Sequence, residues 1–117
     1  KETDPIKHIE YTGVSNDLIL ENLSFIDSLG SQIILRCPII PTLNDTSIHF
    51  DGIAKTGNGL KNLLEINIEP YHPLGEKKAN MLHTKYLLKG LSSPDSDVVS
   101  KWVEAVQAKT NIPVKTT

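Results

Sequence analysis

The sequence predicts an α/β fold: a single domain, residues 1–117, with about three parallel strands and flanking helices. Helical and strand-like patterns alternate along the chain, which is typical of parallel sheets with helical connections. One strand candidate also carries three consecutive apolar residues, as strands covered on both faces do. Three strands are too few to close a barrel, so we expect part of a larger sheet, with its exposed edge on the N-terminal side.

The first predicted helix and strand lie close together in the chain. Residues 15–30 open with the run S-N-D, which supplies an N-cap and an early negative charge, and Gly30 ends this helix. Its apolar residues at helical spacing are Ile19, Leu23, Ile26 and Leu29. Residues 32–37, Q-I-I-L-R-C, form the apolar strand, and we expect Pro38 to end it.

A second helix and strand follow in the middle of the chain. The run D-T-S at 45–47 can cap the helix, and three glycines between residues 52 and 59 keep it short. Residues 63–68 form the next strand, which terminates at Glu69 and Pro70.

The last third of the chain predicts a long connection, a helix and an edge strand. Residues 71–92 are rich in Gly, Pro, Lys and His, which is typical of an irregular loop that carries function or moves. The clearest helix starts at S-P-D, 93–95, with Pro94 as its first residue. Residues 111–115 form a short edge strand, because Pro113 cannot donate to a ladder.

Composition excludes several classes of protein. Twelve Lys and Arg against fourteen Asp and Glu leave a net charge of −2 without a basic run, which argues against a nucleic-acid partner. No apolar stretch is long enough for a membrane span, and the first residues do not form a signal peptide, so we expect a cytoplasmic protein. The single cysteine, Cys37, excludes an internal disulfide and is expected in the core rather than as a nucleophile.

Two residues stand where apolar strands stop, which is where ligands bind in α/β folds. Arg36, the only arginine, can bind a carboxylate through two hydrogen bonds, or it can pair with a neighbouring acid to close the sheet. His72 stands between Pro70 and Pro73, which restrict the backbone around the imidazole. It can hydrogen-bond a ligand hydroxyl, or it can be a loop histidine whose prolines only end a strand.

The remaining histidines do not suggest a metal site. His8, His49 and His83 lack the spacing of metal ligands, so surface or half-buried roles are expected. Nucleotide-binding glycine motifs, phosphate loops and nucleophile elbows are also absent from the sequence.

Four segments carry a more specific pattern. They are DPIKHIEYTGVSNDLILENL (4–23), LRCPIIPTLND (35–45), PYHPLGEKK (70–78) and YLLKGLSSP (86–94). In order and approximate spacing, they resemble the C-terminal half of glycyl-radical enzyme activating enzymes, the relatives of pyruvate formate-lyase activating enzyme. This resemblance covers nearly the whole chain.

The resemblance implies a radical S-adenosylmethionine enzyme with a partial (β/α)6 barrel. In this family a 4Fe–4S cluster reduces S-adenosylmethionine, and the resulting 5′-deoxyadenosyl radical removes hydrogen from a backbone glycine of a glycyl-radical enzyme. Three cofactor-binding residues are implied. Arg36 matches an arginine beside the cofactor and the substrate glycine loop, His72 matches the histidine of a Y-H-x-L-G motif near the nucleoside, and Lys1 matches the lysine of a D-x-K motif. No catalytic residue or metal ligand is assigned to this chain.

One departure from the family is large. The cluster motif C-x3-C-x2-C is absent, and one cysteine cannot hold a cluster. We therefore expect a C-terminal segment that lacks the N-terminal half of the barrel and is inactive alone. The alternative from another class is a non-catalytic interaction module that docks a partner through an exposed sheet edge. A phosphate-binding half-barrel has little support without a phosphate loop.

Overall fold

A computed structural model of the protein describes residues 1–73 and 90–117, so most of the predicted 71–92 loop, with His83, lies outside the described residues. The elements are α1 (Pro5–Thr12), α2 (Asp17–Ser28), β1 (Ile33–Ile39), α3 (Ser47–Asn58), β2 (Leu63–Pro70), α5 (Ser96–Gln107) and β3 (Val114–Thr116). The predicted α/β class is confirmed. Within the described part, no helix is both long and apolar enough to cross a membrane.

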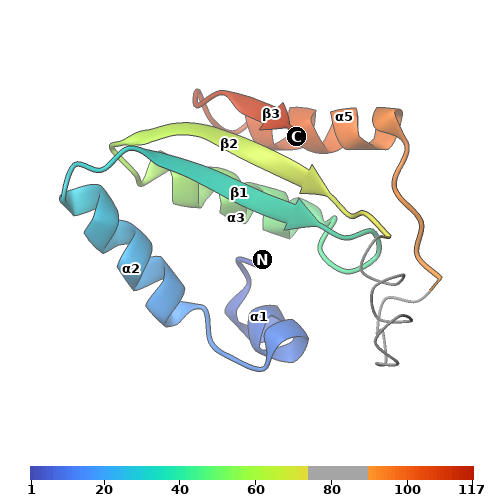
Figure 1. Ribbon diagram of the computed structural model, residues 1–117, viewed down its shortest axis with the longest axis horizontal. Coiled ribbons are helices and arrows are strands. Elements are labelled where there is room, and N and C mark those ends of the chain that lie inside the picture. Colours follow the sequence, from blue (N-terminus) through green and yellow to red (C-terminus); the bar gives the residue numbers. More distant parts are fainter. Residues whose placement is uncertain (74–89) are drawn as a thin grey trace.

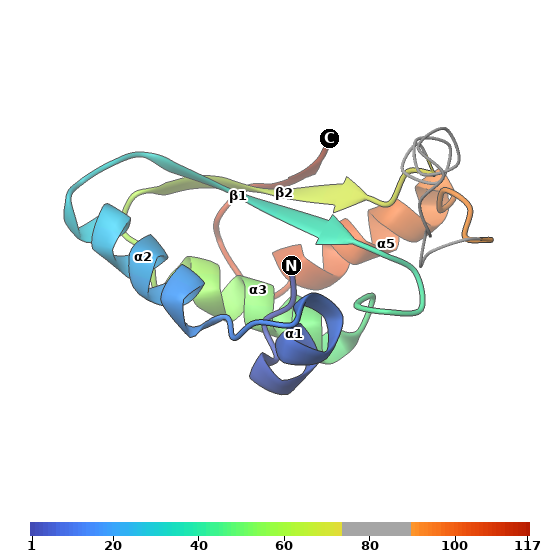
Figure 2. The same cartoon turned by 60° about the horizontal axis from the view of Figure 1, so that its bottom comes forward.

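The three strands form one parallel sheet in the order β1-β2-β3 (Figure 1). Arg36 of β1 lies opposite Asn67 of β2, and Ile68 of β2 lies opposite Thr116 of β3. Figure 2 shows the described helices on one side of the sheet, while no described element covers the other side. We call this second side the open face of the sheet.

The core lies between the sheet and the two helices α3 and α5. Ile39, Ile66 and Ile68 are fully buried on the strands, and Trp102 and Val106 meet them from α5. Alternation along β1 sends Leu35, Cys37 and Ile39 into this core, so Arg36 points to the open face. The core therefore decides which strand residues remain available for a ligand.

Helix α1 was not predicted. Asp4 caps it by accepting hydrogen bonds from the backbone N–H groups of Ile6 (2.9 Å) and Lys7 (3.1 Å). Pro5 occupies its first turn, and Gly13, with φ of 79°, ends it in a left-handed conformation. The pair Asp4-Pro5 was the sequence signal for this helix.

Four predicted boundaries were wrong, and the first is the edge strand expected at 111–115, which is observed as β3 at Val114–Thr116. Pro38 does not end the first strand, because β1 pairs only with β2 among the described elements and an edge strand tolerates a missing N–H. The glycines do not shorten α3, which continues through Gly52 and Gly57 to Asn58. Pro94 precedes α5 instead of beginning it, since the helix starts at Ser96 after Asp95.

Helix α2 exposes much of its predicted apolar stripe. Ile19, Ile26 and Leu29 are 54%, 43% and 66% exposed, and Phe25 is 62% exposed. The helix formed as its periodicity predicted, but no described element covers this surface. An apolar surface of this kind is typical of an interface.

Asp27 joins the end of α2 to the start of β2. Its carboxylate accepts hydrogen bonds from the backbone N–H groups of Lys61 (3.0 Å) and Asn62 (2.8 Å). These bonds to Lys61 and then Asn62 lower the pKa of Asp27. Because the bonds favour the charged carboxylate, they stabilise the fold when Asp27 is ionised.

We expect Asp27→Asn to destabilise the fold at neutral pH and to reduce its loss of stability in acid. The folded pKa lies below the unfolded value, so this stabilisation is present above the unfolded pKa, about 3.9, and disappears as pH falls through the folded pKa. Chemical denaturation between pH 7 and pH 2 measures the effect. Asp51→Asn, at an exposed position on α3, is the control. Equal stability of the two variants at every pH would contradict the prediction.

Candidate functional site

Arg36 lies on the open face of the sheet, near the carboxyl end of β1. Its side chain is 68% exposed, and one guanidinium nitrogen, Nη1, lies 3.6 Å from Oε1 of Glu69. The strand continues past Arg36 to Ile39, so the arginine precedes the strand end instead of forming it. The predicted pairing of Arg36 with a neighbouring acid is therefore observed. Because the distance between the two charged groups is long and Arg36 is exposed, the ion pair is weak and the guanidinium can also bind another anion.

A second ion pair lies on the same face. Lys115 of β3 bonds Glu65 of β2 at 2.9 Å, and this hydrogen bond is the main cause of the lowered pKa of Glu65. With Arg36 and Glu69, these residues place two ion pairs on the open face, beside the exposed side chain of Ile34. A polar face suits a charged ligand better than a second apolar layer.

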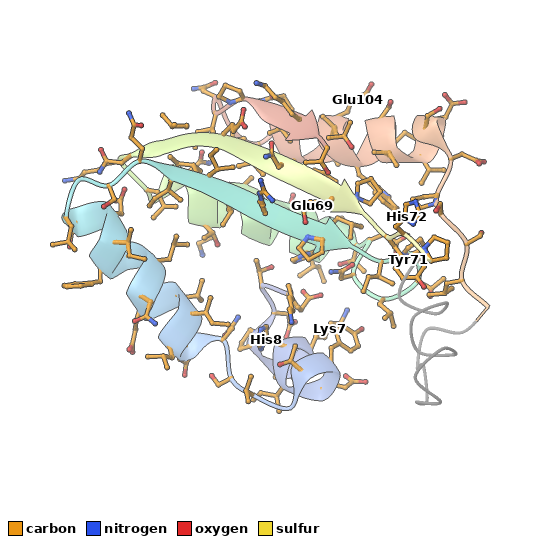
Figure 3. The ribbon with its side chains drawn as sticks, viewed as in Figure 1. Lys7, His8, Glu69, Tyr71, His72 and Glu104 are labelled. Carbon is orange, nitrogen blue, oxygen red and sulfur yellow. The ribbon has the colours of Figure 1, made fainter. Side chains whose placement is uncertain are left out.

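His72 follows the carboxyl end of β2 and is exposed (Figure 3). It lines a hollow of about 480 Å³ together with Tyr71, the start of α5 at Ser96 and the chain end at Thr117. Tyr71 is buried, and its backbone N–H donates to the carbonyl of Ile39 at 2.9 Å. The chain just before His72 is therefore tied to the end of β1.

Lys1 lies beside β1. Its carbonyl accepts a hydrogen bond of 2.8 Å from the side-chain amide of Asn44. Lys1, Arg36 and Cys37 line one cavity of about 90 Å³. The fold thus brings Lys1 and Arg36 to one cavity, whereas His72 lines a separate hollow.

Buried polar residues lie beneath this cavity, and sequence reasoning missed them. Glu2, His8, Asn16 and His49 are each at most 4% exposed and all line the cavity. His8 bonds the carbonyl of Val14 at 2.7 Å through Nδ1. The surface or half-buried roles expected for His8 and His49 were therefore wrong. His49 bonds Thr3, 46 residues away in the chain, and no local pattern shows that contact.

His49 is held in its neutral form. Its Nδ1 accepts a hydrogen bond of 3.1 Å from the backbone N–H of Thr3, which requires an unprotonated nitrogen. Burial, aided by the positive charges of the amino terminus and then of Lys7, lowers the pKa of His49 to about 4. Oε1 of Glu2 lies 3.3 Å from the same nitrogen and would attract a protonated ring. We take the neutral form as dominant because Thr3 already donates to this atom.

The described residues do not fit an iron–sulfur cluster. They contain no group of three His, Cys, Asp or Glu side chains placed to hold a metal ion. Cys37 is buried as expected, and burial raises the pKa of its thiol to about 11, which opposes the thiolate that such a cluster needs.

Comparisons with known proteins identify relatives of the chain. No protein-family model matches it. It is 36% identical over 109 residues to an indoleacetate decarboxylase activating enzyme of Tractidigestivibacter scatoligenes, covering 92% of this chain and 34% of that enzyme. It is 41% identical over 88 residues to a 4-hydroxyphenylacetate decarboxylase activating enzyme of Clostridioides difficile strain 630, covering 74% of this chain and 28% of that enzyme. The chain thus spans roughly a third of the length of these relatives.

A solved structure shares the fold. A domain of a pyruvate-formate lyase-activating enzyme from Bacteroides vulgatus superposes with a TM-score of 0.75 at 19% identity, covering 100% of this chain and 63% of that chain. At this identity the match concerns the fold alone.

Proposed function

This chain is a homologue of glycyl-radical enzyme activating enzymes, and on that premise we propose that it forms the C-terminal segment of such an enzyme. In this proposal the segment supplies part of the S-adenosylmethionine site, and the rest of the protein supplies the cluster. The absence of fitting cluster ligands among the described residues supports this division. A glycyl-radical enzyme is the proposed protein substrate.

The observation that carries the proposal is the exposed guanidinium of Arg36 on the open face, with Lys1 held against the helix-covered side of the same strand, where the two residues line one cavity. An exposed guanidinium can bind a carboxylate with two hydrogen bonds, and a second cation adds to the attraction for an anionic group. We propose that both residues bind and orient S-adenosylmethionine. Once bound and reductively cleaved, this cofactor supplies the radical that removes hydrogen from a glycine of the partner.

His72 is proposed to position the nucleoside of the cofactor. Its hollow of about 480 Å³ has the size of a small-molecule site and is bordered by several hydroxyl side chains. The link from Tyr71 to Ile39 restrains the backbone beside the imidazole. We assign His72 to hydrogen bonding and not to proton transfer. Removal of hydrogen from a backbone glycine by a radical depends on how closely the cofactor is positioned and oriented toward that glycine.

The direct test uses the full-length protein that contains this chain. After anaerobic reconstitution of the cluster, we expect reductant-dependent cleavage of S-adenosylmethionine and a glycyl radical signal in electron paramagnetic resonance when a matching glycyl-radical enzyme is added. A variant of the cluster cysteines is the control and should show neither. A reconstituted wild-type protein that neither binds nor cleaves S-adenosylmethionine would overturn the proposal.

A second candidate is an interaction module, and the exposed apolar side chains of α2 favour it, since such surfaces mark interfaces. In this alternative the surface around Phe25 and Leu29 docks a second copy of the chain, and no cofactor binds. Light scattering coupled to size-exclusion chromatography measures the oligomeric state of the chain and so tests the docking module. A chain that stays monomeric at high concentration would count against the docking module.

A further inference from the structure

We propose that Asn16, Asn44 and His49 form a buried clamp that positions Lys1 at the cofactor site. This inference rests on the proposed function, because it explains how that site is held in place. The three residues are positioning residues, because their hydrogen bonds run to the backbone of residues 1–3.

The clamp consists of hydrogen bonds from three separate parts of the fold to one short segment. Asn44, after β1, donates to the carbonyl of Lys1 at 2.8 Å. Asn16, at the start of α2, donates to the carbonyls of Glu2 (3.3 Å) and Thr3 (3.2 Å). His49 of α3 accepts from the N–H of Thr3 at 3.1 Å.

Burial strengthens these bonds. The clamp residues are almost fully buried, with exposed fractions of 3% for Asn16, 4% for Asn44 and 2% for His49. Water therefore rarely replaces the backbone of residues 1–3 as their hydrogen-bond partner. The bonds to residues 1–3 therefore hold the backbone from which the Lys1 side chain extends, and so restrict the positions that this side chain can reach.

Asn44 also ties the segment to the strand that carries Arg36. Its amide donates to the carbonyl of Pro38 at 3.0 Å, and its side-chain oxygen accepts from the N–H of Ile40 at 2.7 Å. One side chain thus joins Lys1 to the end of β1. The relative position of Lys1 and Arg36 depends on this side chain.

Asn16 shows that the clamp is more than helix stabilisation. It occupies the N-cap position of α2, yet its side chain makes no capping hydrogen bond. Both of its described donor bonds run to residues 2 and 3 instead. Removing this side chain therefore releases the segment without removing a helix cap.

Gly52 supplies the space that the segment needs. A methyl group added at this glycine would collide with the Thr3 side chain, approaching its Cβ to 2.7 Å. Glycine inside a helix is about 1 kcal/mol less favourable than alanine. Its presence in the middle of α3 is explained by the close approach of residue 3.

The test compares two variants of the clamp with two matched controls in the full-length protein. Asn16→Ala and Gly52→Ala should each raise the Kd for S-adenosylmethionine about tenfold, the range typical of lost supporting interactions. Asn62→Ala is the control for Asn16→Ala, because its amide bonds the carbonyl of Asp27 at 2.9 Å, away from residues 1–3. Gly59→Ala is the control for Gly52→Ala, because its added methyl meets only ordinary contacts from 3.5 Å. Both controls should bind the cofactor like the wild type.

A double-mutant cycle separates positioning from general damage. In a Lys1→Ala background, Asn16→Ala should add less than twofold to the Kd, because the group that it positions is gone. Wild-type binding of S-adenosylmethionine by both clamp variants, or full additivity with Lys1→Ala, would overturn the clamp. If the wild-type protein itself does not bind the cofactor, the proposed function fails first, so the two failures are distinguishable.

Discussion

Arg36→Ala should lower the affinity of the full-length protein for S-adenosylmethionine about a hundredfold, because a charge-assisted pair is worth roughly 2–3 kcal/mol. The guanidinium lies 68% exposed on the open face, where Glu69 is a distant partner at 3.6 Å. The proposed site therefore loses its main anion-binding group while the core beneath it is unchanged. Equilibrium dialysis with labelled cofactor measures the effect.

Two further variants show whether the geometry or only the charge of Arg36 is used. Arg36→Lys keeps the positive charge but not the two parallel N–H groups, so it should recover only part of the affinity. Lys115→Ala is the matched control, since Lys115 has a similar exposure of 64% and also bonds a glutamate on β2. If Lys115→Ala weakens cofactor binding as much as Arg36→Ala does, then any positive charge on the open face attracts the cofactor equally, and the assignment of Arg36 is wrong.

Acidification from pH 6.5 to pH 4 should lower the free energy of unfolding by roughly 3 kcal/mol through His49 alone. In the unfolded chain histidine binds a proton near its ordinary pKa of 6.5, whereas burial lowers the folded pKa of His49 to about 4. The unfolded state therefore gains protons first as pH falls, and stability decreases across this window. Denaturant unfolding at a series of pH values measures the slope.

His49→Gln tests the cause of that slope. The variant cannot titrate, so its stability should vary less between pH 6.5 and pH 4 than that of the wild type. His72→Gln is the matched control, because it makes the same replacement at an exposed histidine. The Glu2 carboxylate, 3.3 Å from the His49 ring, opposes this effect, because it attracts a protonated ring. An unchanged slope in His49→Gln would show that Glu2 compensates and that burial does not dominate.

Much of the fold was predictable because its signals are local. The apolar run of β1 and the spacing of α2 depend on neighbouring residues in the chain, and both elements formed where expected. The boundary at Pro38 was not predictable, since a proline ends a central strand but is tolerated at an edge. Whether β1 is an edge depends on which strands pair with it.

The candidate site was predictable only in part. Arg36 and His72 were identified from their places at strand ends, and the four matched segments added Lys1. The cavity shared by Lys1 and Arg36, and the separate hollow of His72, were outside the reach of sequence patterns. The burial of His49 was missed because its partner Thr3 lies 46 residues away in the chain.

Residue order alone determined the α/β class, the sequence of helices and strands, and the kinship with activating enzymes, because periodicity and motifs are properties of short segments. Tertiary structure alone decided which side of β1 carries Arg36, how residues 1–3 are held, and that His49 is buried and neutral. These features arise when segments some 40 residues apart pack together, as Thr3 and His49 do, and solvent exclusion then sets their protonation and hydrogen bonding.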